Sequence, residues 1–376
     1  ICLCPFYVSA EDGVQTDLTP GAKSAILIEA STGKIIYEKN SHEKLAPASM
    51  TKMMSMLLVV ESIENGIIGW DDIITVSANA SGMGGSQILL ETGEQMSVKD
   101  LFKGVAVMSG NDAVVALAEA VAGSQDEFVA MMNKRAKELG LTDTNFKNPH
   151  GLDDTNHYSS AYDMSLIAKE LVKHSQVLEY TKIYEDYLRK GTDKEIWLVN
   201  TNKLVRFYNG VDGLKTGYTS TAGYCLTSTA LKNNMRLIAV VMGEESSTKR
   251  NAEVTSLLDY GYAQYKVDTL LKKDDIIAEV NIEKSKKESV KLVPISEVTK
   301  KNKKINKLGE ITYKLNVEDL KAPVKVGYVV GKLTILNDGK EVSSVDVTVQ
   351  EDIKKANVFE LYLRYLKDIL SGNITI

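Results

Sequence analysis

The sequence contains few of the residues on which several kinds of chemistry depend. Of its 376 residues, three are cysteine and four are histidine. Two cysteines, Cys2 and Cys4, lie in an apolar N-terminal stretch, so the rest of the chain has a single thiol and cannot form an internal disulfide. That thiol, Cys225, stands in a strand-like run, which favours a buried apolar side chain over a catalytic nucleophile. No histidine stands in a Ser-His-Asp pattern, and we expect no metal and no other cofactor.

Long apolar runs and blocks of one charge are also absent. The formal net charge is -5 and 25% of the residues are charged, which describes an ordinary protein surface. Because no block of basic residues appears, we expect no nucleic-acid partner. No apolar run reaches the ~18 residues of a membrane-spanning helix.

Residues 1–10 differ from the rest of the chain. They are apolar, and small side chains stand at Val8 and Ala10. This pattern is typical of the tail of a secretory signal peptide, and it predicts cleavage between Ala10 and Glu11 followed by export. The alternative is a buried N-terminal strand.

Three short polar motifs stand in order along the chain: Ser49-Met50-Thr51-Lys52, Ser109-Gly110-Asn111 and Lys215-Thr216-Gly217. Each motif alone is a weak signal. In the first, the serine and the lysine are three residues apart and would be neighbours on one face of a helix. A serine hydroxyl becomes a nucleophile when a base takes its proton. A lysine can be that base if burial and a second cation lower its pKa, and Lys215 is the candidate cation.

The second motif predicts two polar side chains that face the same way. In an extended segment, Ser109 and Asn111 would point to one side, since alternate residues do so. The hydroxyl could then relay a proton to a leaving amine, and the amide could hold substrate and orient Lys52. The alternative is a structural corner in which Gly110 ends one helix and Asn111 caps the next.

The third motif contains the kinds of residue that bind a carboxylate group. It follows a turn-like segment, 209–213, and is predicted to begin an edge strand. Lys215 and Thr216 offer a cation and a hydroxyl, and Gly217 permits close approach of a substrate backbone. Arg250 could bind the same carboxylate, or form an ordinary ion pair at a helix end. His150 is predicted to be a hydrogen-bonded turn residue, with cleft lining as the alternative.

With their flanking residues, these motifs resemble the serine-type D-alanyl-D-alanine carboxypeptidases, the low-molecular-mass penicillin-binding proteins that trim cell-wall peptides. The likeness runs from about Ala22 to about Tyr265 and continues more loosely beyond. It rests on four stretches: Pro47–Lys52, Ser109–Ala113, His150–Asp153 and Val211–Thr219.

The resemblance implies roles for the residues of the motifs. Ser49 would form an acyl-enzyme, with Lys52, Ser109 and Asn111 as the other catalytic residues. The oxyanion hole would consist of the backbone N–H groups of Ser49 and Tyr218. Many relatives carry histidine where this chain has Tyr218, so the pH behaviour is expected to differ. Substrate would be bound by Lys215, Thr216, Gly217, Tyr218 and Arg250.

The order of the predicted elements favours an α+β protein. Strands near the two ends of residues 20–270, with helices between them, predict an antiparallel sheet flanked by helices plus a helical cluster. The resemblance implies that this region is a penicillin-binding/β-lactamase-like transpeptidase domain. Residues 275–350 are predicted to form a small all-β domain, with Lys300–Lys304 as a solvated loop. Residues 355–372 predict an amphipathic helix that lies on a membrane surface or docks on the β-rich domain.

The resemblance also implies a function. We expect hydrolysis of the terminal D-Ala-D-Ala bond of the peptidoglycan stem pentapeptide, and covalent binding of β-lactam antibiotics. The protein would work at the outer face of the bacterial cytoplasmic membrane or in the cell wall. Alternatives are a transpeptidase or β-lactamase of the same fold, or a non-catalytic wall-binding scaffold. A class A β-lactamase needs a glutamate that activates water, and no convincing motif for one lies between Ser109 and Lys215. The three intact motifs argue against the scaffold.

Overall fold

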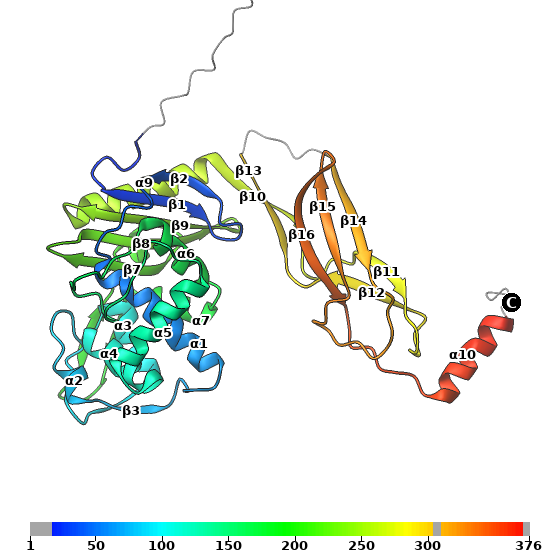
Figure 1. The fold of residues 1–376 in the computed structure, drawn as a ribbon, viewed down its shortest axis with the longest axis horizontal. Coiled ribbons are helices and arrows are strands. Elements are labelled where there is room, and N and C mark those ends of the chain that lie inside the picture. The colour runs from blue at the N-terminus through cyan, green and yellow to red at the C-terminus, as the bar shows by residue number, and fades with distance from the viewer. Residues whose placement is uncertain (1–16, 304–309, 371–376) are drawn as a thin grey trace, which may run out of the picture. The chain divides into compact units, whose positions relative to one another are not determined.

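The computed structural model describes residues 17–303 and 310–370, and it divides into two units, Ile1–Tyr262 and Ala263–Ile376 (Figure 1). The predicted signal peptide remnant, residues 1–10, lies outside the described residues. The first unit is built on a five-stranded antiparallel sheet in the order β2-β1-β9-β8-β7. Its strands are β1 (Ser24–Glu29), β2 (Ile35–Lys39), β7 (Val211–Thr219), β8 (Gly223–Lys232) and β9 (Met235–Glu244).

Both faces of this sheet are covered by helices, because its central strands are apolar on both sides. Ile26 and Ile238 belong to the core shared with the helical cluster. Leu27 and Leu237, one residue along each strand, lie against Gly261 of the last helix of the unit, α9 (Ser247–Gln264). This alternation is the two-residue period of a strand, and it fixes α9 and the helical cluster on opposite faces.

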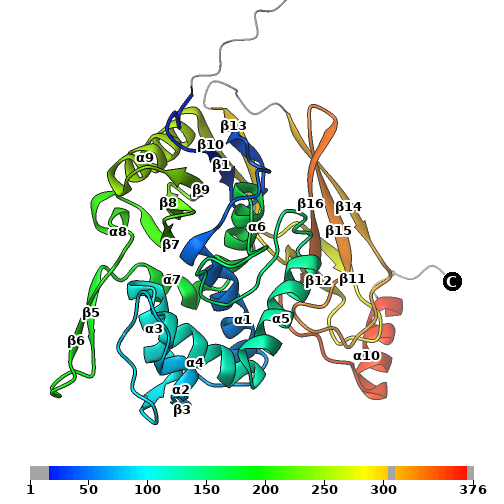
Figure 2. The ribbon, with the colours of Figure 1, turned by 60° about the vertical axis from the view of Figure 1, so that its left-hand side comes forward.

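The helical cluster surrounds α1 (Lys52–Glu64), which is contacted by α3, α4, α5 and α6. Ser97 and Ser124 cap two of these helices by accepting from Asp100 N and Glu127 N. Apart from α1, the elements of the cluster have the following bounds: α2 (Ala78–Ser81), α3 (Val98–Met108), α4 (Asn111–Ala122), α5 (Gln125–Glu138), α6 (Ala161–Leu171), α7 (Ser175–Thr181), α8 (Leu204–Phe207), β3 (Ile73–Thr75) and β4 (Gln95–Ser97). A hairpin of β5 (Glu185–Leu188) and β6 (Ile196–Val199) stands out from it (Figure 2).

The third motif lies inside β7 and does not begin it. The strand already starts at Val211, which pairs with Ala230. The predicted turn therefore ends at Gly210, and the three motif residues sit in the middle of the strand. Its predicted place at the edge of the sheet is confirmed. Cys225, on the neighbouring strand β8, is fully buried, as predicted.

The second unit contains a five-stranded antiparallel sheet in the order β11-β12-β16-β15-β14 and a separate pair, β10 and β13. Its core includes Leu292, Leu333 and Val347. The strands are β10 (Tyr265–Leu271), β11 (Ala278–Asn281), β12 (Ser289–Pro294), β13 (Val298–Lys303), β14 (Ile311–Val317), β15 (Gly331–Asn337) and β16 (Lys340–Val349).

The prediction of a loop at Lys300–Lys304 is wrong for residues 300–303. They belong to β13, which pairs with β10, a strand that the sequence analysis missed. A lysine-rich sequence does not prevent a strand, because the paired backbone supplies the hydrogen bonds. Lys304 lies outside the described residues.

A helix follows the second sheet. Its bounds are α10 (Val358–Leu370), in the region where the sequence predicts an amphipathic helix. Val358, Tyr362 and Ile369 of its apolar face are 85%, 62% and 56% exposed. None of the helices that the structure describes is long and apolar enough to cross a bilayer.

Candidate active site

The candidate nucleophile lies at the start of the central helix. Ser49 belongs to a short 3-10 turn, η1 (Ala48–Thr51), that leads directly into α1 at Lys52. The Lys52 ammonium nitrogen lies 3.0 Å from Ser49 Oγ. The turn and helix thus bring together the two residues that their spacing predicts to be neighbours.

Lys52 is held in a polar cage inside the protein. Its side chain is fully buried, and Nζ lies 2.6 Å from both Asn111 Oδ1 and the His150 carbonyl oxygen. Burial lowers the pKa of Lys52 well below its usual value, and the positive charge of Lys215 lowers it further. The negative charge of Asp112 acts in the opposite direction. A base with a lowered pKa can take the proton of Ser49 near neutral pH.

Ser109 stands at the corner between α3 and α4. It ends α3 in the left-handed conformation, with φ 63°, and its side chain is 4% exposed. Its hydroxyl oxygen has no hydrogen-bond partner among the described residues. Asn111 is the first residue of α4. The predicted functional pair therefore stands at the helix-to-helix corner that the alternative interpretation describes.

The third motif faces the nucleophile from β7. The Thr216 hydroxyl donates to Thr201 Oγ1 at 2.7 Å. A Cβ on Gly217 would lie 2.8 Å from the Pro47 carbonyl oxygen, so a glycine is needed for the strand to approach the nucleophile turn. Lys215 is fully buried, and burial followed by the charge of Arg250 lowers its pKa to about 7.

Arg250 lies in the first turn of α9, where its side chain is 5% exposed. It donates to Asn251 Oδ1 and to the Cys225 carbonyl oxygen. It forms no ion pair with any residue that the structure describes. Burial lowers its pKa to about 10, where it remains charged at neutral pH. A buried cation without a counter-ion favours an anionic ligand.

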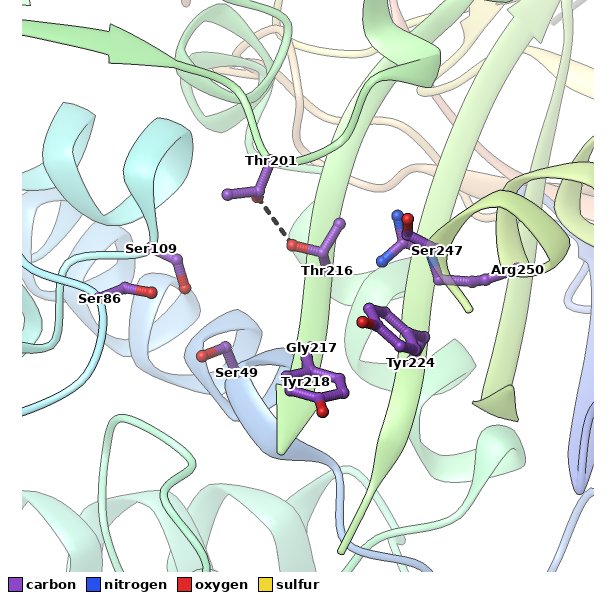
Figure 3. Close-up of a pocket in the computed structure, with 10 residues that line it drawn as sticks. All are labelled: Ser49, Ser86, Ser109, Thr201, Thr216, Gly217, Tyr218, Tyr224, Ser247 and Arg250. Carbon is purple, nitrogen blue, oxygen red and sulfur yellow. Dashed lines mark hydrogen bonds between the residues drawn. The ribbon is translucent and has the colours of Figure 1, made fainter. Parts of the chain in front are cut away.

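Six of the residues predicted by the sequence line a cavity of about 280 Å³, whereas Lys52, Asn111 and Lys215 are not among its lining residues (Figure 3). Ser49, Ser86 and Ser109 lie on one side of it, and Thr216, Ser247 and Arg250 lie toward the other. Tyr218 is 56% exposed, and its ring centroid lies 4.3 Å from that of Tyr224. The lining residues are Ser49, Ser86, Ser109, Thr201, Thr216, Gly217, Tyr218, Tyr224, Ser247 and Arg250.

Four of the lining residues are not predicted by the sequence motifs: Ser86, Thr201, Tyr224 and Ser247. Ser247 lies three residues before Arg250, and this spacing on a predicted helix could have identified it. Tyr224 is the cross-strand partner of Tyr218, which becomes visible once the hairpin register is known. Ser86 and Thr201 lie in irregular segments with no motif.

His150 contributes its backbone and not its ring to the site. Its carbonyl oxygen accepts from Lys52, and its Nδ1 accepts from Leu152 N at 3.2 Å. Burial lowers the pKa of the ring to about 3. The imidazole is therefore a neutral part of the turn, in agreement with the preferred sequence interpretation.

One group of possible metal ligands occurs among the described residues: Glu61, Glu170 and His174. The Arg135 guanidinium already lies 2.6 Å from Glu61 and 3.4 Å from Glu170. Because this cation neutralises the carboxylates, the group is an ion-pair network on the helical cluster. It is separate from the cavity.

A serine in contact with a buried lysine, beside a cationic pocket, is the arrangement expected of a serine acyl-transferase site. Comparison with known proteins specifies the family. Residues 11–246 match the family model of D-alanyl-D-alanine carboxypeptidase, and residues 265–355 match that of the penicillin-binding protein 5 C-terminal domain. The chain therefore belongs to the D-alanyl-D-alanine carboxypeptidase family.

Individual relatives match along most of their length. D-alanyl-D-alanine carboxypeptidase DacF of Bacillus subtilis is 49% identical over 98% of this chain and 95% of that protein. The crystal structure of penicillin binding protein 5 from Haemophilus influenzae has a TM-score of 0.70 at 35% identity, covering 89% of this chain and 98% of that one. The crystal structure of ampicillin-bound penicillin-binding protein D2 from Listeria monocytogenes has a TM-score of 0.58 at 31% identity. The match covers 64% of this chain and 98% of that one.

Proposed function

We propose that the protein releases the terminal D-alanine from peptidoglycan stem peptides through an acyl-enzyme on Ser49. The observation that supports this most directly is the 3.0 Å contact between Ser49 Oγ and Lys52 Nζ, with the lysine fully buried. Membership of the carboxypeptidase family supports the substrate class.

In the proposed acylation step, neutral Lys52 takes the hydroxyl proton while Ser49 Oγ attacks the carbonyl carbon of the penultimate D-alanine. The carbonyl oxygen becomes an oxyanion that accepts from the N–H groups of Ser49 and Tyr218. Ser49 suits this role because the first N–H groups of a helix have no partner within it. The C–N bond then breaks, and the proton passes from Lys52 through the Ser109 hydroxyl to the departing amine. The free hydroxyl of Ser109 supports its place in the relay.

The terminal carboxylate would be held at the opposite end of the cavity. Arg250 supplies a buried positive charge without an ion-pair partner among the described residues, and the Thr216 hydroxyl lies close by, where it would turn from Thr201 Oγ1 to donate to the carboxylate. Lys215 adds positive charge behind them. Charge-assisted hydrogen bonds of this kind contribute about 1.5–3 kcal/mol each, which is enough to favour a substrate with a free C-terminus.

Water would release the acyl group by the reverse use of the same base. Among the residues that the structure describes, no glutamate lines the cavity, which argues against the class A β-lactamase alternative. Because β-lactams mimic the acylating peptide, and because a relative is known in an ampicillin-bound form, we propose that penicillins acylate Ser49 covalently.

The test is D-alanine release from a pentapeptide, measured with and without an amine acceptor. We expect release without the acceptor, and none from Ser49→Ala, which should also lose covalent penicillin labelling. Label that persists on another residue in this variant would refute the assignment of Ser49. Release that requires the amine would favour the transpeptidase alternative.

We further propose that the protein works outside the cytoplasm, at the outer face of the cytoplasmic membrane or in the cell wall, and that α10 rests on the membrane surface. Its exposed Val358, Tyr362 and Ile369 support this, because an amphipathic helix can bury such a face among lipid headgroups. The charges of the helix nearly cancel, so binding should depend on apolar area and change little with salt.

Liposome co-sedimentation of the full chain and of the Tyr362→Glu variant tests this. We expect the variant to remain in the supernatant, while Glu360→Gln, a matched change in the same helix, pellets with the liposomes. Equal sedimentation of all three proteins would favour the alternative in which the helix docks on the β-rich domain.

A further inference from the structure

One wall of the cavity is an irregular segment, residues 84–90, between α2 and β4. It places Ser86 at the cavity, beside Ser49 and Ser109 (Figure 3). Having no regular secondary structure, the segment depends on side chains from other elements for its position. These come from the start of α4 and from the β5–β6 hairpin.

Asp112, the second residue of α4, is the main anchor. Its carboxylate is completely buried. Oδ1 accepts from Ile88 N at 3.1 Å, and Oδ2 accepts from Ile88 N at 3.1 Å and from Leu90 N at 3.0 Å. Oδ1 also accepts from Ala113 N at 2.8 Å. One carboxylate therefore joins two amides of the wall to the N-terminus of α4, where a negative charge is favoured.

Asn111 and Arg189 hold the carbonyl groups of the same segment. Asn111 donates from its backbone N to Ser86 O at 2.6 Å and from Nδ2 to Gly84 O at 2.7 Å. Arg189 donates to Ile88 O at 3.0 Å and to Leu89 O at 3.3 Å. Its charge is balanced by Glu94, at 2.6 Å. The wall is thus fixed from both sides.

Asp112 also acts electrostatically on Lys52, the proposed base. No lysine or arginine in the described part of the chain forms an ion pair with it, yet its charge acts on Lys52 and raises the pKa of that group. The other groups that face Lys52 are Lys215 on β7, which lowers this pKa, and neutral His150 in the adjoining turn. Asp112 is therefore the anion that offsets the positive surroundings of Lys52.

We propose that Asp112 is a positioning residue for acylation: its carboxylate fixes the wall that carries Ser86 and supplies a buried negative charge at the residue next to Asn111, whose Oδ1 contacts Lys52 Nζ. The second part rests on the proposed role of Lys52 as the base. The first part concerns the fold of the site alone, and it can be tested without any turnover.

Three variants separate the two parts. Asp112→Asn removes the charge, and its amide nitrogen cannot accept from the wall. Asp112→Glu keeps the charge but displaces the carboxylate by one methylene group. Arg189→Gln is the matched control, because it loosens the same wall without being among the charges that act on Lys52.

The first measurement is amide hydrogen exchange at Leu90 in the full-length protein. Loss of one hydrogen bond to a charged group should speed exchange at least about tenfold in Asp112→Asn, the factor that corresponds to ~1.4 kcal/mol. Asp112→Glu should also exchange faster than the wild type. Unchanged protection in both variants would overturn the positioning role, even if the wild type released no D-alanine.

The second measurement is the pH profile of kcat/KM. In Asp112→Asn the acid limb should move to lower pH, because Lys52 loses its counter-charge. In Asp112→Glu and Arg189→Gln the limb should stay in place while the rate falls. If the acid limb of the pH profile stays in place in Asp112→Asn, or shifts by the same amount in Arg189→Gln, the proposed electrostatic effect of Asp112 on Lys52 is overturned. Should Asp112→Asn fail to fold, full activity in Asp112→Glu would overturn the proposal.

Discussion

The substitution Gly217→Ala tests how closely the nucleophile turn and β7 are packed. A Cβ at this position would lie 2.8 Å from Pro47 O, 3.1 Å from Ala48 Cβ and 3.3 Å from Met50 N. All three atoms belong to the turn that carries Ser49 or to the residue before it. Since carbon and oxygen do not approach so closely without strain, the turn must move away from the strand by several tenths of an ångström.

Such a movement has two expected consequences. Overpacking of this kind costs about 1–3 kcal/mol of stability. Misplacing a reacting group by about 1 Å can cost on the order of a hundredfold in rate, so a smaller shift predicts penicillin labelling that is slower by roughly tenfold or more. The rate should suffer far more than the fold, because the strain falls on the nucleophile itself.

The assay is the rate of labelling by a fluorescent penicillin, accompanied by thermal denaturation. Gly140→Ala is the matched control: Gly140 has φ +73° and no atom within 4 Å of its added Cβ. That variant should lose about 1–2 kcal/mol through backbone strain and label at the wild-type rate. Wild-type labelling of Gly217→Ala, or an equal slowing in the control, would refute the reasoning.

Three further outcomes follow from the site and its surroundings. Lys52→Ala should fold, as judged by circular dichroism, but should label slowly with penicillin; a wild-type rate would move the base elsewhere. Amidating the substrate's terminal carboxylate should lower kcat/KM by a factor worth ~1.5–3 kcal/mol per lost hydrogen bond, and equal rates for acid and amide would exclude Arg250 as its partner. Burial lowers the pKa of His157 to about 4, below the value of about 6.5 in the unfolded chain. The unfolded state therefore binds this proton first, so the free energy of unfolding should fall as pH drops from about 6.5 towards 4. Urea denaturation should give a shallower pH slope for His157→Gln, and an unchanged slope would contradict this cause.

Local spacing predicts the part of the site that lies within one element. Ser49 and Lys52 are neighbours because they are three residues apart at the start of a helix. Ser109 and Asn111 lie close in space because both belong to the corner between α3 and α4. The cavity itself joins segments far apart in sequence. Ser86 lies in a segment whose backbone is bound by Asp112, Asn111 and Arg189, and no local pattern carries that information.

The fold shows the same limit. The hairpins and capped helices of the first unit depend on short-range signals, and the α+β class follows from their order. The pairing of β10 with β13 joins residues about 30 positions apart, and the lysines of β13 give it the composition of a loop. Whether a segment forms a strand depends on the neighbouring strand with which it pairs, and amino-acid composition does not identify that neighbour.

The three neighbours of Lys52 Nζ are not equivalent. Asn111 Oδ1 and the His150 carbonyl oxygen can only accept a hydrogen bond, whereas the Ser49 hydroxyl can donate or accept. An ammonium satisfies all three oxygens with its three protons. A neutral amine keeps two protons on the carbonyl oxygens and turns its lone pair to the hydroxyl. The change of protonation therefore reverses one hydrogen bond and requires no movement of a heavy atom, so the proposed proton transfer from Ser49 would begin in a site that is already organised for both states.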